Sequence, residues 1–433
     1  MLALSVDLSS VFETYGVEND GLVDFVWLQN FSCIEFSSIC LEYSFLEVRL
    51  GYPQTDLDKI VYFKSDYKSP PFSQQRVRKG WHSYFVKLPQ EVAQTKKVVI
   101  EFNKSLDIAQ DSRFLGAMLS YCFMFKTHPY MAQVEALNVS IDECLNEYEG
   151  HDGFLDIDAY LTHKIKADES NFYAVNTLKP MAANAINHGI GKYSVMSKRE
   201  VWLDKHIASS SRVLDVGCGF GGLAFLTKRD IKLYGVDVSD ENVMRAKAAG
   251  YQDVVKTSAC SLPFPDHYFD YVVSLDVFGH IALAEKDLVM SEMARVLKPN
   301  GCMLHGIEVD DFNSDAMGAE DFLRMVLVDG HIGIETRSQV LERFTRHHFV
   351  LEDDFLIGNC CMSVDHWIRA HYLYGTNLAP DVALYFLNLN AQEKQAFDIG
   401  VGKTFWALRS ENYDSRGTGG LFFVRARKVS TLM

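Results

Sequence analysis

The sequence lacks long hydrophobic runs and has no surplus of basic residues. No apolar stretch approaches the roughly 20 residues that a membrane-spanning helix requires, so we expect no membrane span. The 42 lysines and arginines are outnumbered by 57 aspartates and glutamates, which gives a formal net charge of −15. Because an acidic surface repels phosphate backbones and anionic lipids, nucleic acid is not an expected partner.

An ordered cysteine pattern is also missing. The nine cysteines form neither metal-ligand spacings nor an evident disulfide framework, so we predict no metal site. The tandem Cys360 and Cys361 favour a buried structural pair, because no partner spacing accompanies them. The opening stretch MLALSVDLSSVFETYG lacks the basic start of a secretory signal and already carries Asp7. We therefore expect a cytoplasmic protein with reduced thiols.

The 433 residues fall into segments of different character, and a chain of this length predicts two or three domains. In residues 1–108, apolar and polar residues alternate in short stretches between turn residues, which predicts an antiparallel β-sandwich. Residues 109–195 carry apolar residues at helical spacing, as in FLGAMLSYCFMF and MAQVEALNVSIDECLNEYEG, which predicts a helical connector or lid. Residues 196–433 alternate strands with helices, the pattern of an α/β domain with a mainly parallel sheet.

A glycine-rich turn, LDVGCGFGG, occupies residues 214–222 after the first predicted strand of this domain. Glycine allows a ligand to approach the backbone closely. A phosphate loop would end in Gly-Lys-Ser/Thr, which does not occur here. The carboxylate of Asp215 would repel the pyrophosphate of a dinucleotide but attract a cation, so an NAD-dependent oxidoreductase is disfavoured. A second acid, Asp237, ends the next strand, where it can accept both hydroxyls of a ribose. The turn and the two acids predict a ligand that bears adenosine, lacks phosphate and is partly cationic.

Four motifs follow one another in this region: VLDVGCGFGG, GVDVS, LPFPDHYFDYVVSLDVFGHI and EMARVLKPNGCML. Over about residues 196–310 they resemble the successive motifs of class I S-adenosylmethionine-dependent methyltransferases. The resemblance implies an enzyme with a Rossmann-like domain whose last strand is antiparallel, and S-adenosyl-L-methionine as its cofactor. It places Asp215 near the methionine end, Asp237 on the ribose and Val238 beside the adenine. The cofactor-binding residues that it implies are Asp215, Gly217, Cys218, Gly219, Asp237, Val238, Ser258, Ala259, Leu275 and Asp276.

One position departs from the family pattern. Family members often carry an acid-Ala pair whose carboxylate meets the adenine amino group, whereas this chain has Ser258 and Ala259. A serine hydroxyl is a weaker acceptor than a charged carboxylate. We therefore expect weaker cofactor binding in an unchanged binding mode.

Three residues are candidates for the chemistry. Methyl transfer is accelerated mainly by alignment, and a base is needed when the acceptor is a poorly acidic hydroxyl or amine. His280 follows the fourth strand and resembles a family position at the methyl-transfer centre, although a capping or packing role explains it equally well. His331 stands in a glycine-flanked turn that can aim it into a pocket, or that exists for the turn alone. Asp310 follows the fifth strand, at the sheet edge where ligands bind.

Two further segments concern the lid and the acceptor. Tyr173 and Tyr193, upstream of the glycine turn, either cover the cofactor or belong to a core. The segment between the last two predicted strands, about residues 358–418, is long and rich in aromatic residues. An insertion of this length usually has helices and a function of its own, so we expect it to form the acceptor pocket of the methyltransferase domain.

The N-terminal stretch DKIVYFKSDYKSPPFSQQRVRKGWHSYFVKLP is similar to a small β-sandwich segment of bacterial surface-polysaccharide enzymes. This resemblance favours O-methylation of a sugar hydroxyl in surface glycan assembly (O-antigen, capsule or lipopolysaccharide), with a small molecule or a glycan as acceptor. Two alternatives stay open. One is a methyltransferase for a small aromatic or amine metabolite, and the other is an inactive glycan-binding or scaffold protein. The sequence also leaves the oligomeric state open, a homo-oligomer included.

Overall fold

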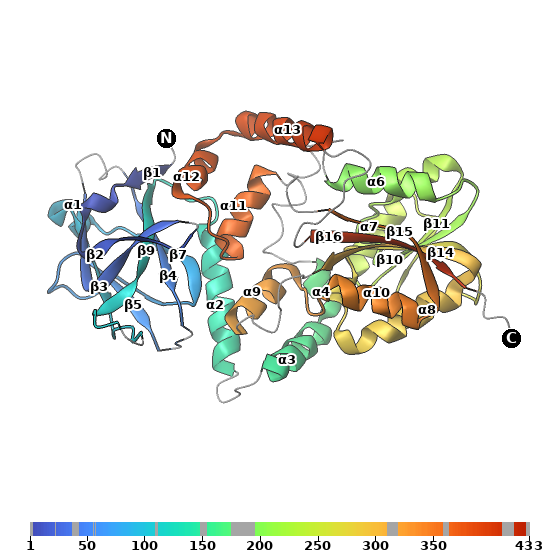
Figure 1. Ribbon diagram of the computed structural model, residues 1–433, viewed down its shortest axis with the longest axis horizontal. Helices are drawn as coiled ribbons and strands as arrows, with labels where there is room; N and C mark the ends of the chain where they lie inside the picture. The colour runs from blue at the N-terminus through green and yellow to red at the C-terminus, as the bar shows by residue number, and fades with distance from the viewer. Residues whose placement is uncertain are drawn as a thin grey trace. The chain divides into compact units, whose positions relative to one another are not determined.

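The computed structural model divides the chain into two compact units (Figure 1). The first unit comprises residues Met1–Cys144 and Val364–Lys394, and the second comprises Leu145–Ser363 and Gln395–Met433. The residues that the structure describes are 3–21, 23–36, 43–54, 56, 58–108, 111–147, 154–174, 195–309, 319–357, 363–408 and 420–429. Within these ranges, no helix is both long enough and apolar enough to span a bilayer.

The first unit is built on nine antiparallel strands that belong to one hydrogen-bonded sheet. The strand order is β6-β5-β8-β3-β9-β4-β7, with β1 added to β9 and β2 added to β3. The side-chain amide of Gln75 on β6 donates to the carbonyl of Phe85 on β7 at 2.8 Å, so the two end strands of this order meet. The strands are β1 (Ala3–Val6), β2 (Val11–Asn19), β3 (Asp24–Glu35), β4 (Phe45–Tyr52), β5 (Ile60–Lys64), β6 (Ser73–Arg76), β7 (Gly80–Lys87), β8 (Lys97–Phe102) and β9 (Leu115–Phe125).

The helical prediction for FLGAMLSYCFMF was wrong. From Leu115 onward these residues form β9, which pairs with β3 on one side and with β4 on the other. Nearly every side chain of β9 is buried. A strand that is buried on both faces loses the alternation of apolar and polar residues, and its continuous apolar run cannot be told from a buried helix by periodicity alone.

Two helices from the predicted insertion belong to the first unit. They are α11 (Val364–Leu373) and α12 (Pro380–Asn388), and α12 contacts β1 (Figure 1). The buried guanidinium of Arg49 on β4 donates to the carbonyls of His371, Gly375 and Thr376 at 3.2, 3.2 and 2.9 Å. The sequence alone assigns this segment to the methyltransferase domain, but its buried polar contacts are with the N-terminal sheet. The acceptor-pocket role of the insertion stays a prediction. The other helices of this unit are α1 (Gln90–Thr95), the short turn η1 (Leu8–Ser10) and most of α2 (Met131–Glu147).

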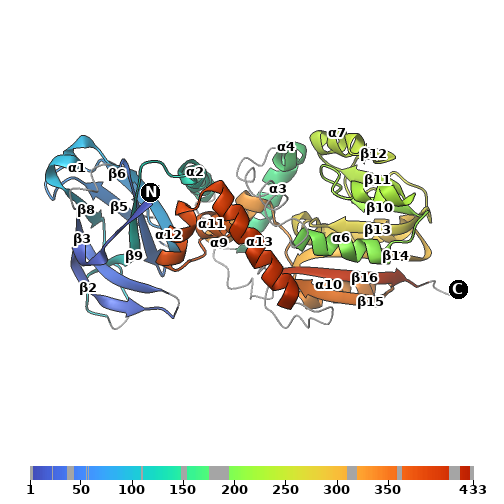
Figure 2. The same cartoon turned by 90° about the horizontal axis from the view of Figure 1, so that it is seen from above.

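The second unit contains a seven-stranded sheet in the order β12-β11-β10-β13-β14-β16-β15 (Figure 2). The first five strands run parallel, and β16 runs antiparallel to both β14 and β15. This confirms the predicted Rossmann-like sheet with an antiparallel last strand. The strands are β10 (Arg212–Val216), β11 (Lys232–Asp237), β12 (Asp253–Lys256), β13 (Phe269–Leu275), β14 (Leu297–Val309), β15 (Phe349–Ile357) and β16 (Gly420–Lys428).

Helices flank this sheet, and the carboxyl ends of β10, β11 and β13 meet at one edge, where open α/β sheets bind ligands. The α-helices are α3 (Phe154–Ala167), α4 (Glu169–Ala174), α6 (Val195–His206), α7 (Asp240–Ala248), α8 (Lys286–Val296), α9 (Ala319–Asp329) and α10 (Arg337–Arg346). Short 3-10 turns occur at η4 (Ala224–Arg229), η5 (Phe278–His280) and η6 (Leu283–Glu285), and α13 (Ala391–Leu408) starts in the first unit and ends in the second.

Candidate cofactor and methyl-transfer site

The glycine turn after β10 adopts a backbone that other residues rarely adopt. Gly217, Gly219 and Gly221 have φ angles of +71°, +51° and +93°. A Cβ on Gly217 would lie 2.4 Å from Cγ2 of Val277, so this position requires glycine both for its conformation and for the close packing. The amide of Gly217 donates to the carbonyl of Val236 at 2.9 Å and ties the turn to the end of β11.

A cavity of about 210 Å³ opens beside this turn. It is lined by the carboxylates of Glu169, Asp237, Asp276 and Glu285, and no lysine or arginine is among its lining residues in the described part of the chain. Such a lining favours a cation and disfavours a phosphate. Of the predicted site residues it contains Gly217, Gly219, Asp237, Val238, Ser258, Ala259, Asp276 and His280. Sequence reasoning missed the lining residues Glu169, Asn242 and Glu285.

Asp237 is held in place at the end of β11. One carboxylate oxygen accepts from the amide of Gly219 at 2.9 Å. The other accepts from the amide of Ser239 at 2.9 Å and from the side-chain amide of Asn242 at 3.1 Å. These three donors orient the carboxylate on the cavity wall, a position compatible with the ribose contact that we predicted.

Asp215 lies beneath the turn and is not among the residues that line the cavity. The residue is 4% exposed, and its carboxylate accepts from the hydroxyl of Tyr251 at 2.6 Å. Burial raises the pKa of Asp215 to about 7, because a desolvated carboxylate loses hydration. The buried Cys218 and the half-buried Leu275 are also not part of the lining. The predicted cofactor contacts of these three residues stay predictions.

Asp276 follows β13 with a φ angle of +57°, a left-handed conformation that aspartate tolerates better than most residues. Its amide donates to the carbonyl of Gly306 at 2.9 Å. Its carboxylate accepts from the largely buried guanidinium of Arg199 on α6 at 2.6 Å. The ion pair therefore fixes an acid on the cavity wall next to the end of β13.

The two candidate histidines lie side by side. Their ring centroids are 4.6 Å apart. Nδ1 of His280 is 3.1 Å from the carbonyl oxygen of Gly330, and because a carbonyl can only accept, Nδ1 carries the proton and Nε2 is the basic nitrogen. Nε2 of His331 lies 3.7 Å from Oε1 of Glu308, an acid that sequence reasoning missed. The third candidate, Asp310, lies outside the described residues.

Tyr173 on α4 connects the cavity to these histidines. Its ring lies 5.3 Å from that of His280, and its hydroxyl donates to the carbonyl of His280 at 3.3 Å. Tyr173 also lines the cavity, which is compatible with the predicted lid. The second lid candidate, Tyr193, lies outside the described residues.

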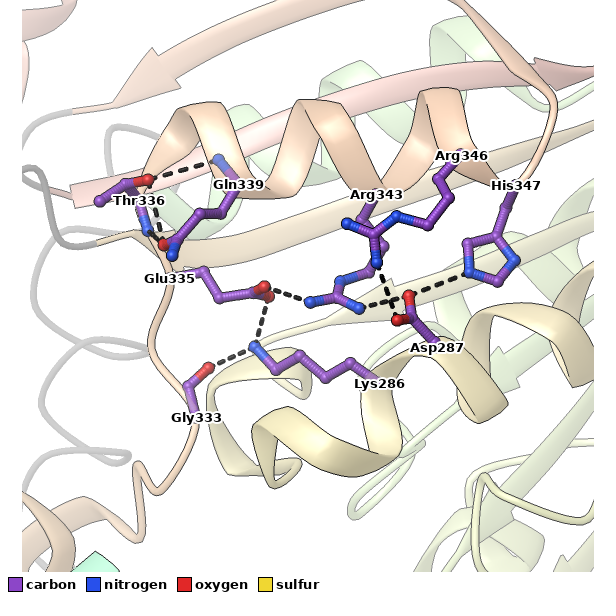
Figure 3. Close-up of polar contacts among 9 residues, drawn as sticks. All are labelled: Lys286, Asp287, Gly333, Glu335, Thr336, Gln339, Arg343, Arg346 and His347. Atoms are coloured by element: carbon purple, nitrogen blue, oxygen red, sulfur yellow. Dashed lines mark hydrogen bonds and ion pairs between the residues drawn. The ribbon is translucent and has the colours of Figure 1, made fainter. Parts of the chain in front are cut away.

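A buried ion cluster holds the loop that carries His331 (Figure 3). The ammonium of Lys286 is completely buried, pairs with Glu335 at 2.6 Å and donates to the carbonyl of Gly333. The guanidinium of Arg343 on α10 pairs with both Glu335 and Asp287, and its distance to the Asp287 carboxylate is 2.5 Å. The amide of Gly333 in turn donates to the carbonyl of Gly279 at 2.9 Å. The cluster therefore fixes the His331 loop against η5, which carries His280.

The sheet order, the glycine turn after β10 and the acid at the end of β11 agree with the resemblance to class I S-adenosylmethionine-dependent methyltransferases. Residues 214–305 match the family described as "Methyltransferase domain", so the resemblance is confirmed for this part of the chain. The resemblance of the N-terminal segment to polysaccharide enzymes stays a prediction.

Curated relatives align over the same domain. The chain is 31% identical over 109 residues to the 27-O-demethylrifamycin SV methyltransferase of Amycolatopsis mediterranei, covering 23% of this chain and 39% of that protein. It is 34% identical over 114 residues to the demethylmenaquinone methyltransferase of Symbiobacterium thermophilum, covering 24% and 45%. It is 30% identical over 156 residues to the fatty-acid O-methyltransferase of Mycolicibacterium smegmatis, covering 34% and 56%. The chain thus spans about half or less of the length of these relatives.

Among solved structures, a phosphoethanolamine N-methyltransferase of Haemonchus contortus in complex with S-adenosyl-L-methionine is similar with a TM-score of 0.40 and 16% identity. The alignment covers 72% of this chain and 64% of that chain.

Proposed function

We propose that this protein is an S-adenosylmethionine-dependent methyltransferase that methylates a hydroxyl group of a sugar. The observation that carries the proposal is the cavity at the carboxyl ends of β10 and β11, which combines a bare glycine turn with an acidic wall. An acidic lining stabilises a sulfonium and an ammonium group and disfavours a pyrophosphate. S-adenosylmethionine, when bound, supplies an electrophilic methyl group.

His280 is the proposed base. A sugar hydroxyl is a poor nucleophile until its proton is removed, and a positioned histidine can accept that proton as the oxygen bonds to the methyl carbon. Nδ1 of His280 donates to the carbonyl of Gly330, which leaves Nε2 as the proton acceptor. The imidazolium that forms keeps this hydrogen bond. The carboxylate of Glu308, beside the neighbouring His331, adds negative charge that stabilises it.

A hollow in the first unit supports a sugar as the acceptor. It has a volume of about 600 Å³ and lies between β6, β7 and α2. Its lining combines the amides of Gln74, Gln75 and Asn138, the rings of Phe72 and Phe85, and charged side chains of both signs. Amides both donate and accept hydrogen bonds, as hydroxyl-rich ligands require. Together with the polysaccharide-enzyme resemblance of residues 58–89, this chemistry favours a glycan.

The acidic cavity favours a second acceptor class. Four carboxylates, from Glu169, Asp237, Asp276 and Glu285, line one cavity. Arg199 pairs with Asp276 and Lys166 pairs with Glu285, so Glu169 and Asp237 supply the negative charge that would also attract an acceptor with an ammonium group. A methyltransferase for an amine metabolite is therefore the second candidate.

Incubation of the protein with methyl-labelled S-adenosylmethionine and candidate acceptors tests both acceptor classes, the sugar hydroxyl and the amine. The acceptors are nucleotide sugars, surface oligosaccharides and a matched set of primary and secondary amines. The proposal predicts label on a sugar oxygen, and it predicts that His280→Asn lowers kcat by about 10²-fold or more, with the affinity for S-adenosylhomocysteine little changed. Label on nitrogen would move the assignment to the amine class. Cofactor binding without transfer to any hydroxyl or amine would favour the inactive glycan-binding or scaffold protein.

A further inference from the structure

The adenine side of the cavity has no acid where the family often has one. The loop after β12 reads Thr257-Ser258-Ala259-Cys260, and all four residues line the cavity. The Ser258 hydroxyl already accepts from the amide of Cys260 at 3.2 Å. A neutral hydroxyl that is partly committed to its own loop is a poor replacement for a carboxylate acceptor.

A carboxylate faces this loop from a different element. Glu169 is the first residue of α4, and α4 contacts α7 (Figure 2). Glu169 lines the cavity together with Thr257 and Ser258. It also lines an adjoining hollow of about 410 Å³ with the same two residues and with Val238, the residue that we expect beside the adenine.

The surroundings of Glu169 leave its oxygens able to accept a ligand. The side chain is half-buried, and within the described ranges no group donates a hydrogen bond to its carboxylate. Its neighbour Lys166 is engaged in an ion pair with Glu285. Desolvation raises the pKa of Glu169; the positive charge of Lys166 opposes this rise, and the negative charges of Glu285 and Asp237 add to it. A hydrogen-bond donor from a ligand would stabilise the charged form.

From this arrangement we infer that Glu169 accepts the hydrogen bond of the adenine amino group and takes over the role of the acid that is replaced by Ser258. The inference rests on the proposed use of S-adenosylmethionine. The sequence alone predicts α4 only as part of a connector or lid. With this inference, α4 forms one wall of the cofactor site. Residues four apart share one face of a helix, and both Glu169 and Tyr173 line the cavity. One face of α4 therefore follows the cavity from the adenine side, at Glu169, to His280, beside Tyr173.

The test is calorimetric binding of S-adenosylhomocysteine and of its inosine analogue, in which a carbonyl replaces the adenine amino group. We expect the wild type to prefer the adenine compound. Glu169→Gln should weaken adenine binding about tenfold, the size of one charge-assisted hydrogen bond, and should reduce the preference, because a glutamine amide can donate to the inosine carbonyl. The double variant Glu169→Gln/Ser258→Asp should restore both the affinity and the preference.

Glu241→Gln is the matched control, because it removes one negative charge from α7, the helix that α4 contacts, at a side chain that does not line the cavity. It should leave the preference for adenine over inosine unchanged. The preference is a ratio within one protein sample, so partial unfolding of a variant does not alter it. An unchanged preference in Glu169→Gln would overturn the inference, as would equal effects of the two glutamine variants. Failure of the wild type to bind either compound would instead contradict the proposed function.

Discussion

Asp215 is a carboxylate whose charge is costly in the folded state. Its pKa is raised to about 7 by burial, above the ordinary value of 3.8. Between these values the folded protein binds a proton that the unfolded chain does not bind. Stability from this group is therefore present at low pH and is lost as the pH rises toward 7.

Asp215→Asn removes this loss, since an amide oxygen can still accept from Tyr251. From pH 5 to 7 the free energy of unfolding of the wild type should fall relative to that of the variant by roughly 1.4 kcal/mol per pH unit. Above about pH 7 the difference should become constant, because Asp215 is then ionised in both states. Urea denaturation at several pH values measures it, with the exposed Asp381→Asn as control. A difference independent of pH would show that Asp215 is ionised throughout.

Individual site residues could be predicted from the sequence only where they belong to a short local motif. Gly217 and Asp237 belong to short motifs that end two parallel strands, and the chain itself puts them on one sheet edge. Glu169 and Glu308 have no such signal. Glu169 reaches the cavity from a short helix more than 40 residues before the glycine turn, and Glu308 approaches His331 from the far end of β14. Their roles depend on tertiary packing that no spacing encodes.

At the scale of elements, the loop between α9 and α10 brings His331 to His280. This loop passes so close to η5 that a Cβ on Gly333 would lie 1.9 Å from the carbonyl oxygen of Ile281. Moving the backbone of the loop away from η5 is costly, because the buried Lys286 donates to the carbonyl of Gly333 and pairs with Glu335 (Figure 3). Space for a side chain is lacking at this point.

Gly333→Ala should therefore displace the His331 loop from η5. We expect a fall in kcat of about tenfold or more, since small misplacements of catalytic groups are costly, and little change in the affinity for S-adenosylhomocysteine. Gly16→Ala is the matched control, because a Cβ there meets nothing within 4 Å. Steady-state kinetics and calorimetry measure the two quantities. Wild-type kcat in Gly333→Ala would show that the loop does not position the site.

Elements with clear periodicity were predicted well, and elements buried on both faces were not. The alternation of strands and helices in the second unit gave its parallel sheet, because each element has its own period and turn residues. The continuous apolar run of Leu115–Phe125 resembled a helix but forms β9 at the centre of a sheet. Whether such a run is helix or strand is decided by its tertiary neighbours, which the local sequence does not contain.

At the scale of the whole molecule, the first unit is assembled from two distant parts of the chain. Its sheet buries Glu47 and Arg49 completely. The Glu47 carboxylate accepts from the hydroxyl of Tyr372 at 2.9 Å, and the guanidinium of Arg49 donates to three carbonyls in the segment that includes the end of α11 and the turn after it. Within the sheet, Glu47 also accepts from Ser83 and Tyr121, and Arg49 also donates to Ser83. Residues 364–394 complete the hydrogen bonding of these two buried charges, whose burial with fewer partners would be costly.

Two consequences are measurable. A fragment of residues 1–147 should not unfold cooperatively when expressed alone, because α11 is missing. In the full chain, Arg49→Met should lower the free energy of unfolding by about 3 kcal/mol. Arg245→Met, which removes an exposed i,i+4 ion pair with Glu241, should change it by less than about 0.5 kcal/mol. Cooperative unfolding of the fragment with full stability would contradict this account of how the unit is built.

The central claim is that the cavity beside the glycine turn holds S-adenosylmethionine. Calorimetric titration of S-adenosylmethionine and S-adenosylhomocysteine into the wild type, Asp237→Ala and Asp240→Ala tests it most directly. Asp240 is the matched control, because it is an exposed acid three residues further along the same connection. We predict binding by the wild type and by Asp240→Ala, and a loss of about tenfold or more in Asp237→Ala, which lacks the charged acceptor. No binding by the wild type, or equal binding by all three proteins, would contradict the claim.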